Sequence, residues 1–161
     1  MAGATRPPLP DWHAPSPDAI TPDRASVQAW LDAYVRAWQS YAPAAIADLW
    51  TDDALWIYPF GVRARGRAAI TAQWLGEKHL DTPGGYDAQY EPIAIDGDLV
   101  VAHGRTRFFD PLTGATQAEY DNIWVLRFGP DGRCAEFHEW YARRPDDARR
   151  AGQLSRPPSA E

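Results

Sequence analysis

Apolar residues in the first half of the chain recur every three or four positions, which is the spacing of one helix face. Thr21 followed by Pro22 predicts the start of the first helix, with a hydroxyl N-cap and Pro at the first helical position. The apolar stripe of this helix is largely aromatic and comprises Val27, Trp30, Leu31, Tyr34, Val35 and Trp38. The pattern predicts, in order, a helix over about 22–40, a shorter helix from Pro43, a strand over 54–58 and a helix over about 67–78.

From residue 86 onwards the apolar spacing changes to the alternation of strands. Turn signals rich in Gly, Pro and Asp lie at 96–97, 110–114 and 129–132, and each predicts a hairpin connection. The predicted strands cover about 86–95, 98–109, 115–128 and 133–143. Strands of this length exceed the usual ~5–6 residues, which predicts a long, twisted and curved sheet. Helices followed by an antiparallel meander indicate an α+β fold with the helices on one face.

Composition narrows the class of protein. The 161 residues are 45% hydrophobic and 24% charged, which is typical of a globular chain of about one domain. A formal net charge of −6 without a basic block argues against nucleic-acid binding. The single cysteine, Cys134, excludes an internal disulfide, and the four histidines lack metal-ligand spacing, so we expect no metal and no cofactor. We find no signal peptide and no apolar run of the ~18 residues that a membrane span needs, and expect a cytoplasmic protein.

Proline gathers at both ends of the chain. This enrichment predicts a Pro-rich N-terminal arm over 1–21 and a disordered C-terminal tail over 145–161. Between them, the periodic pattern predicts one domain over 22–144.

Several short sequence motifs indicate a protein family. They are Tyr34–Trp38, Ile46–Trp50, Thr51–Ala54, Pro59–Gly61 and Gly66–Ile70, with Leu126–Arg133 and Glu139–Tyr141 in the last hairpin. In this order they resemble the nuclear transport factor 2-like superfamily, in particular its SnoaL-like and ketosteroid-isomerase-like members, over about residues 24–144. The resemblance implies three N-terminal helices packed on a strongly curved, mainly antiparallel sheet that forms a cone-shaped barrel with an internal pocket. Unrelated reactions share this fold, so function has to be argued from the pocket.

Two well-known reactions of the superfamily depend on catalytic residues that this chain lacks. Tyr34 matches the tyrosine that donates to the oxyanion in ketosteroid isomerases, but Tyr58 and Trp124 stand where their base and second acid belong. The resemblance therefore does not imply steroid isomerisation by that route. Arg105 and Glu139 match the arginine and one carboxylate of limonene-epoxide-hydrolase-like members, whereas Arg107 replaces their second carboxylate.

Two further types of enzyme in the superfamily match the residues of this chain only in part. Dehydratase-like members pair an Asp at the end of the first helix with a His, but Trp38-Gln39-Ser40 stands at that position. His79 or His103 could supply the histidine without this partner. SnoaL-type cyclases use an acidic group in the pocket, and Glu139 is the candidate for it.

Strand alternation assigns some of these residues to a face. The even positions 120–128 are nearly all apolar and are predicted to face the helices, with Asn122 as the polar exception. For 133–143 the choice between the Glu139 row and the His138 row stays open, because a slip of one residue exchanges the faces. The resemblance places His103, Arg105 and Arg107 on one face near Asn122, Trp124 and Glu139. It also leaves Val100, Ala102, Thr106 and Phe108 on the outer face, as the apolar surface of an expected homodimer.

These observations predict a cofactor-independent acid/base enzyme of the isomerase, cyclase, lyase or hydrolase type that acts on a hydrophobic cyclic or polyketide-like molecule. Glu139 is the predicted acid/base, Arg105 tunes it, and Tyr34 orients the substrate. The predicted substrate-binding residues are Trp38, Trp56, Tyr58, His79, His103, Arg107, Asn122 and Trp124. Two alternatives stay open: a non-catalytic ligand-binding or dimeric assembly module with an aromatic-filled pocket, and a structural Arg105–Glu139 ion pair.

Overall fold

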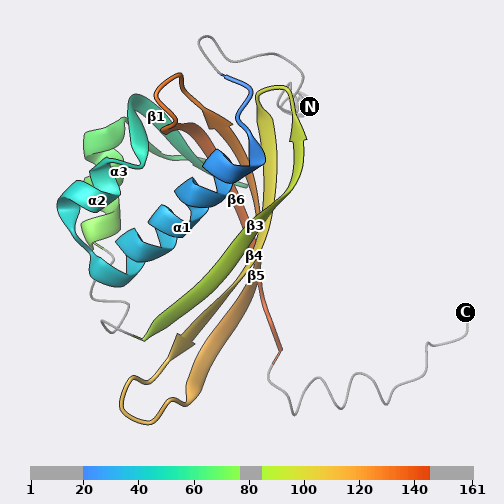
Figure 1. The fold of residues 1–161 in the computed structure, drawn as a ribbon. Coiled ribbons are helices and arrows are strands. Elements are labelled where there is room, and N and C mark those ends of the chain that lie inside the picture. The colour runs from blue at the N-terminus through green and yellow to red at the C-terminus, as the bar shows by residue number, and fades with distance from the viewer. Residues whose placement is uncertain (1–19, 77–84, 146–161) are drawn as a thin grey trace, which may run out of the picture.

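The computed structural model describes residues 20–76 and 85–145. These residues form an α+β fold in which three helices lie on one face of a single curved sheet (Figure 1). The elements are α1 (Arg24–Ser40), α2 (Pro43–Ala47), β1 (Trp50–Tyr58), β2 (Gly61–Arg65), α3 (Arg67–Gly76), β3 (Tyr86–Asp96), β4 (Leu99–Phe109), β5 (Thr116–Phe128) and β6 (Cys134–Arg143). None of the helices within the described ranges is long and apolar enough to cross a membrane. The predicted terminal arms lie almost wholly outside these ranges.

The six strands follow the order β2-β1-β6-β5-β4-β3. All neighbours are antiparallel except β1 and β6, which run parallel. The sheet is therefore mixed, mainly antiparallel and open, because β2 and β3 remain edge strands, and its curvature agrees with the predicted cone rather than with a closed barrel. The sequence pattern did not predict β2, since Gly61–Arg65 is only five residues long and mostly exposed.

The first helix begins slightly later than predicted. Asp23, not Thr21, is the N-cap, and its carboxylate accepts a hydrogen bond of 2.7 Å from the backbone N–H of Ser26. Pro22 therefore precedes the cap instead of occupying the first helical position. Both residues are compatible with a helix start, but a carboxylate three residues before a free N–H is a preferred cap.

Aromatic side chains form most of the core between α1 and the sheet. Trp30 packs edge-on against Phe128 and Trp50, with ring centroids 5.5 and 5.8 Å apart. Its indole N–H donates to the carbonyl of Leu49 at 2.9 Å, so this buried polar group is satisfied. One turn later, Tyr34 lies over Trp124, and this order fixes α1 across the concave face.

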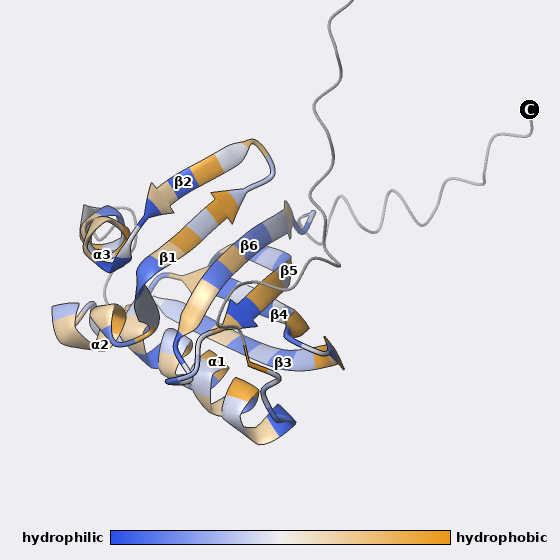
Figure 2. Ribbon diagram, turned by 90° about the horizontal axis from the view of Figure 1, so that it is seen from above, coloured by the Kyte–Doolittle hydropathy of each residue, from blue (hydrophilic) through white to orange (hydrophobic). Residues whose placement is uncertain are grey.

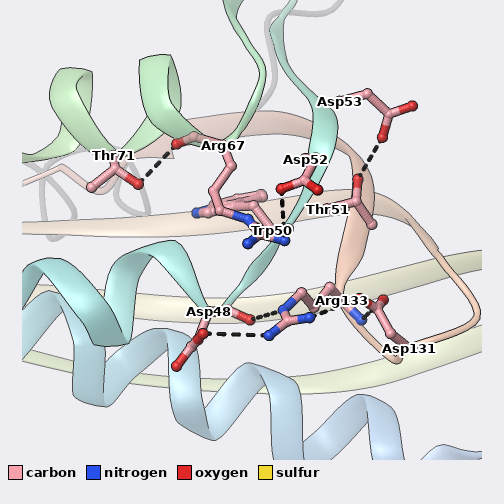
Figure 3. A network of polar contacts seen from close by, with 9 residues as sticks. All are labelled: Asp48, Trp50, Thr51, Asp52, Asp53, Arg67, Thr71, Asp131 and Arg133. Atoms are coloured by element: carbon pink, nitrogen blue, oxygen red, sulfur yellow. Dashed lines mark hydrogen bonds and ion pairs between the residues drawn. The ribbon is translucent and has the colours of Figure 1, made fainter.

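A polar network fixes the end of the sheet at which β1 and β6 begin (Figure 3). The guanidinium of Arg67 donates to the carbonyl of Trp50 at 2.9 Å and pairs with Asp52 at 3.2 Å. Arg133, just before β6, donates to the carbonyl of Asp48 at 3.1 Å and pairs with Asp131 at 2.8 Å. These contacts join α2, α3, β1 and the β5–β6 hairpin, and so support the parallel pairing of the first and last strands.

Alternation along the strands separates the inner from the outer face (Figure 2). On β4, Val100, Ala102 and Thr106 are buried against the helices, and Phe108 lies on the same row. Their predicted place on the outer face is therefore wrong. A homodimer stays a prediction, and its outer-face surface would instead include Ile123 and Trp140, which are 39% and 36% exposed.

We predict that Gly104→Ala destabilises the protein by about 1–3 kcal/mol, because the ring of Tyr90 lies flat against this glycine. A Cβ at position 104 would come within 1.9 Å of Tyr90 Cδ1 and 2.6 Å of the Gln89 carbonyl. Gly76→Ala is the matched control, since no atom of the described residues lies within 4 Å of its Cβ position. Urea unfolding compares the two variants, and equal stability for both would contradict this packing.

Candidate active site

A cavity of about 440 Å³ lies between α1 and the concave face of the sheet. It sits where β3 and β5 begin and β4 and β6 end. Five of the seven tyrosines of the chain line it, namely Tyr34, Tyr86, Tyr90, Tyr120 and Tyr141. Polar groups are few, as in most small-molecule sites: Thr106, Gln117, Asn122 and Glu139 supply the other polar side chains.

The pairing of β5 with β6 places Glu139 in this cavity. Trp124 stands directly opposite Glu139, and Asn122 stands opposite Tyr141. Residues opposite each other in an antiparallel pair share a face, so Glu139 points to the same side as the buried Trp124. The row Phe137, Glu139 and Tyr141 is therefore the inner one, which settles the choice that the sequence left open.

Burial changes the acidity of Glu139. Loss of water around the carboxylate raises the pKa of Glu139 to about 7, since the charged form is disfavoured among aromatic rings. The indole N–H groups of Trp56 and Trp124, the charge of Arg63 and the hydroxyl of Tyr58 act in the opposite direction. The indole N–H groups of both tryptophans lie near the carboxylate without meeting hydrogen-bond geometry. A carboxyl group with this pKa exchanges a proton readily near neutral pH.

The arginine that acts on Glu139 is Arg63 rather than the predicted Arg105. Arg63 lies on β2, with its guanidinium carbon 5.0 Å from the Trp56 ring centroid and 4.5 Å from that of Tyr58. This cation–π stacking holds the positive charge beside the carboxylate. Arg105 is exposed on the outer face and pairs with Asp121 at 3.4 Å.

A hydrogen-bond network covers the wall of the cavity formed by β3, β4 and β5. The hydroxyls of Tyr90 and Thr106 are 2.7 Å apart, and the amide of Asn122 donates to Thr106 at 2.9 Å. Asn122, the polar exception in its row, thus has protein partners on two neighbouring strands. The network fixes the amide, whose carbonyl can accept from a bound molecule.

The two phenols of Tyr34 and Tyr58, close to Glu139, remain protonated. Burial raises the pKa of Tyr34 well above its usual value, and the charge of Glu139 raises it further. The same two causes, in that order, raise the pKa of Tyr58. These hydroxyls are therefore hydrogen-bond donors over the whole physiological pH range.

The structure brings together part of the predicted site. Tyr34, Trp38, Asn122 and Glu139 all line the cavity. Trp56, Trp124 and Tyr58 lie next to Glu139 without being part of the cavity lining. His79 lies outside the described residues.

His103, Arg105 and Arg107 are on the wrong face for the predicted site. Their row on β4 alternates with the buried row, and Arg107 stacks over Phe109 and pairs with Asp87. Small or apolar residues alternate with polar ones over 100–107, and this alternation indicates which row faces outwards. The family resemblance placed the arginine row inside and thereby hid Thr106, as well as Tyr86 and Tyr90 on the neighbouring strand.

Metal-ligating residues do not gather in the part of the chain that the structure describes. No group of three or more His, Cys, Asp or Glu side chains there could hold a metal ion. Cys134 is buried, and burial raises the pKa of its thiol, so that the reactive thiolate is disfavoured.

Comparison with known proteins identifies the family. The model of the SnoaL-like domain matches residues 31–137, and the chain belongs to this family. A search of curated proteins finds no match. The match ends two residues before Glu139, so family membership does not depend on this carboxylate.

Solved structures with the same fold have low sequence identity to this chain. A SnoaL-like protein of unknown function from Burkholderia thailandensis is 20% identical, with a TM-score of 0.57 over 74% of this chain and 97% of that one. An NTF2-like protein with a cystatin-like fold from Novosphingobium aromaticivorans is 24% identical, with a TM-score of 0.56 over 80% and 87%. A hypothetical protein with a ketosteroid isomerase-like fold from Catenulispora acidiphila, solved in complex with trimethylamine, is 15% identical, with a TM-score of 0.54 over 70% and 85%. At these identities the likeness concerns the fold.

We predict that Glu139→Gln stabilises the protein at pH 8 relative to the wild type, by up to about 3 kcal/mol. Below the ordinary pKa of 4.5 the carboxyl group is protonated in both folded and unfolded states. Between pH 4.5 and about 7 the unfolded chain releases this proton while the folded chain retains it, so the free energy of unfolding falls as pH rises. Urea unfolding of both proteins across this range measures the difference, and parallel pH curves would contradict a half-buried, weakly acidic Glu139.

We predict that Arg63→Gln raises the pKa of Glu139 further, because it removes the neighbouring positive charge. Arg105→Gln is the matched control and leaves this pKa unchanged, since Arg105 lies on the other face. A carbon-13 NMR titration of the Glu139 carboxyl in each variant makes the comparison. An equal response to both substitutions would assign the tuning to neither arginine.

Proposed function

We propose that this protein is a small-molecule enzyme of the isomerase type, in which Glu139 moves a proton on a hydrophobic cyclic substrate. The observation that supports it is a carboxyl group with a pKa of about 7 inside an aromatic cavity. Loss of water around a carboxylate costs folding free energy, and catalytic groups are enriched among residues with such shifted pKa values. The SnoaL-like family and the ketosteroid isomerase-like fold of a solved relative favour the same class.

The geometry suggests a role for each group. The Glu139 carboxylate accepts a proton from a carbon next to a carbonyl group, and the electron pair of that C–H bond moves towards the carbonyl oxygen. The protonated Tyr34 hydroxyl donates a hydrogen bond to the developing oxyanion. Glu139 then returns the proton to a second carbon, so that atoms and charge balance without a further reactant. Asn122, held by Thr106, orients the substrate.

A non-catalytic ligand-binding module is the second candidate. It is favoured by the charge inventory of the cavity, because Glu139 is the one acid among the described lining residues. Epoxide hydrolysis and dehydration need a second acid or base, which narrows the enzymatic proposal to proton transfer by a single group. A binding module would bind its ligand without any proton transfer by Glu139.

We predict that Glu139→Gln lowers the kcat for isomerisation of β,γ-unsaturated cyclic ketones by about 10²–10⁴-fold. In the wild type the rate rises with pH through about 7 and then levels, because the base is the carboxylate. Glu119→Gln, a carboxylate on β5 that pairs with Arg144, is the control and keeps the wild-type rate. Ultraviolet absorbance of the conjugated product follows the reaction. Equal rates in both variants would remove Glu139 from the mechanism, and a rate no higher than that of buffer in the wild type would favour the binding module.

A further inference from the structure

We propose that the ligand of this cavity carries a positively charged nitrogen, as in a protonated tertiary amine or a quaternary ammonium group, held between an aromatic belt and Glu139. The aromatic belt consists of five rings that line the cavity, Trp38, Tyr86, Phe108, Tyr120 and Tyr141, and of Tyr58, which lies beside Tyr141. The inference rests on the ligand-binding part of the proposed function and specifies the class of ligand. It is independent of the reaction that Glu139 catalyses.

The belt is a continuous series of ring contacts around the end of the sheet. Ring centroids are 5.6 Å apart for Trp38–Tyr86, 5.5 Å for Tyr86–Phe108 and 6.0 Å for Phe108–Tyr120. The series continues at 5.8 Å for Tyr120–Tyr141 and 6.2 Å for Tyr141–Tyr58. All five pairs are edge-to-face, and the rings come from α1 and from five of the six strands. Aromatic rings carry negative charge on their faces, and several of them together form the usual site for ammonium groups.

The charge inventory of the cavity points to the same class of ligand. Among the described lining residues, Glu139 is charged and no lysine, arginine or histidine is present. Arg63, which acts on Glu139 electrostatically, stacks on Trp56 and Tyr58 and does not line the cavity. Among the described residues, an anionic ligand would therefore meet a carboxylate and aromatic rings without a positive partner, whereas a cation is attracted by both.

The pKa values of the tyrosines near Glu139 show that the electrostatic potential around them is negative. The charge of Glu139 contributes to raising the pKa of Tyr34, Tyr58, Tyr86 and Tyr90, after burial as the main cause in each. These hydroxyls come from α1, β1 and β3, so the charge of Glu139 acts on groups from three elements around it. A potential that opposes a phenolate also opposes a bound anion and attracts a bound cation.

The affinity for a cation should depend on whether Glu139 is protonated. The groups that face this carboxyl are Arg63 from β2, Tyr58 from β1, Tyr34 from α1, and Tyr86 and Tyr90 from β3. Burial keeps the four phenols protonated between pH 6 and 8, and Glu139 titrates in this range. A bound cation favours the carboxylate, so the affinity for a cation rises with pH across about 7, whereas that for a neutral ligand does not.

Three probes of similar shape test the proposal on the full chain: choline, its neutral isostere 3,3-dimethylbutan-1-ol, and the anion 3,3-dimethylbutanoate. Tryptophan fluorescence and isothermal titration measure their affinities at about pH 6 and pH 8. We expect choline to bind about tenfold more tightly than the alcohol at pH 8, with a smaller ratio at pH 6, and the anion to bind most weakly.

Two variants separate charge from shape. Glu139→Gln should abolish the pH dependence and most of the preference for choline while leaving the affinity for the alcohol within about twofold. Glu119→Gln should change neither, because Glu119 does not line the cavity. Equal or tighter binding of the alcohol or the anion, or no binding of any probe at its solubility limit, would overturn the proposal. Loss of isomerisation in Glu139→Gln together with such a result would leave the acid/base role intact, so the two proposals fail separately.

Discussion

The pairing register between β5 and β6 determines what the cavity contains. It sets Glu139 opposite Trp124 and Tyr141 opposite Asn122, so that one carboxylate and one amide stand in an otherwise aromatic row. A shift of one residue would bring His138 and Trp140 inside and turn Glu139 to the outer face. The register is maintained by the apolar residues of the same row, because Phe137, which is buried, would also be exposed by such a shift. The acidity of the site is therefore a consequence of core packing.

The cavity illustrates a balance between stability and chemistry. Aromatic rings from α1 and the sheet exclude water from Glu139, and this raises its pKa towards neutrality. The indole N–H groups of Trp56 and Trp124 and the stacked guanidinium of Arg63 reduce the effect without cancelling it. A fully satisfied carboxylate would be a stronger acid and a weaker base at neutral pH, and an unassisted one would destabilise the fold further. The intermediate environment keeps both protonation states accessible.

The elements of the fold were largely predictable from the sequence, because periodicity and turn residues are local signals. The three helices and the four long strands lie within a few residues of their predicted bounds, whereas the five residues of β2 are too few for their alternation to give a clear signal. Glu139, Tyr34, Trp38 and Asn122 were also predictable as lining residues, since each lies in an apolar row or matches the family. The face of His103, Arg105 and Arg107 was wrong because a resemblance was preferred over alternation. Arg63 could not have been found from spacing, since its place beside Glu139 depends on the parallel pairing of β1 with β6.

That parallel pairing also determines how the chain can fold. The strand that is last in the sequence, β6, lies between β1 and β5 in the middle of the sheet. During synthesis the preceding strands leave the ribosome with their inner rows exposed. The native sheet cannot be completed until the residues of β6 have emerged. Such non-local pairing slows folding and lengthens the time during which apolar edges are accessible to other chains. The domain is therefore expected to fold after translation as one unit, and a chain that ends before β6 would lack its central strand.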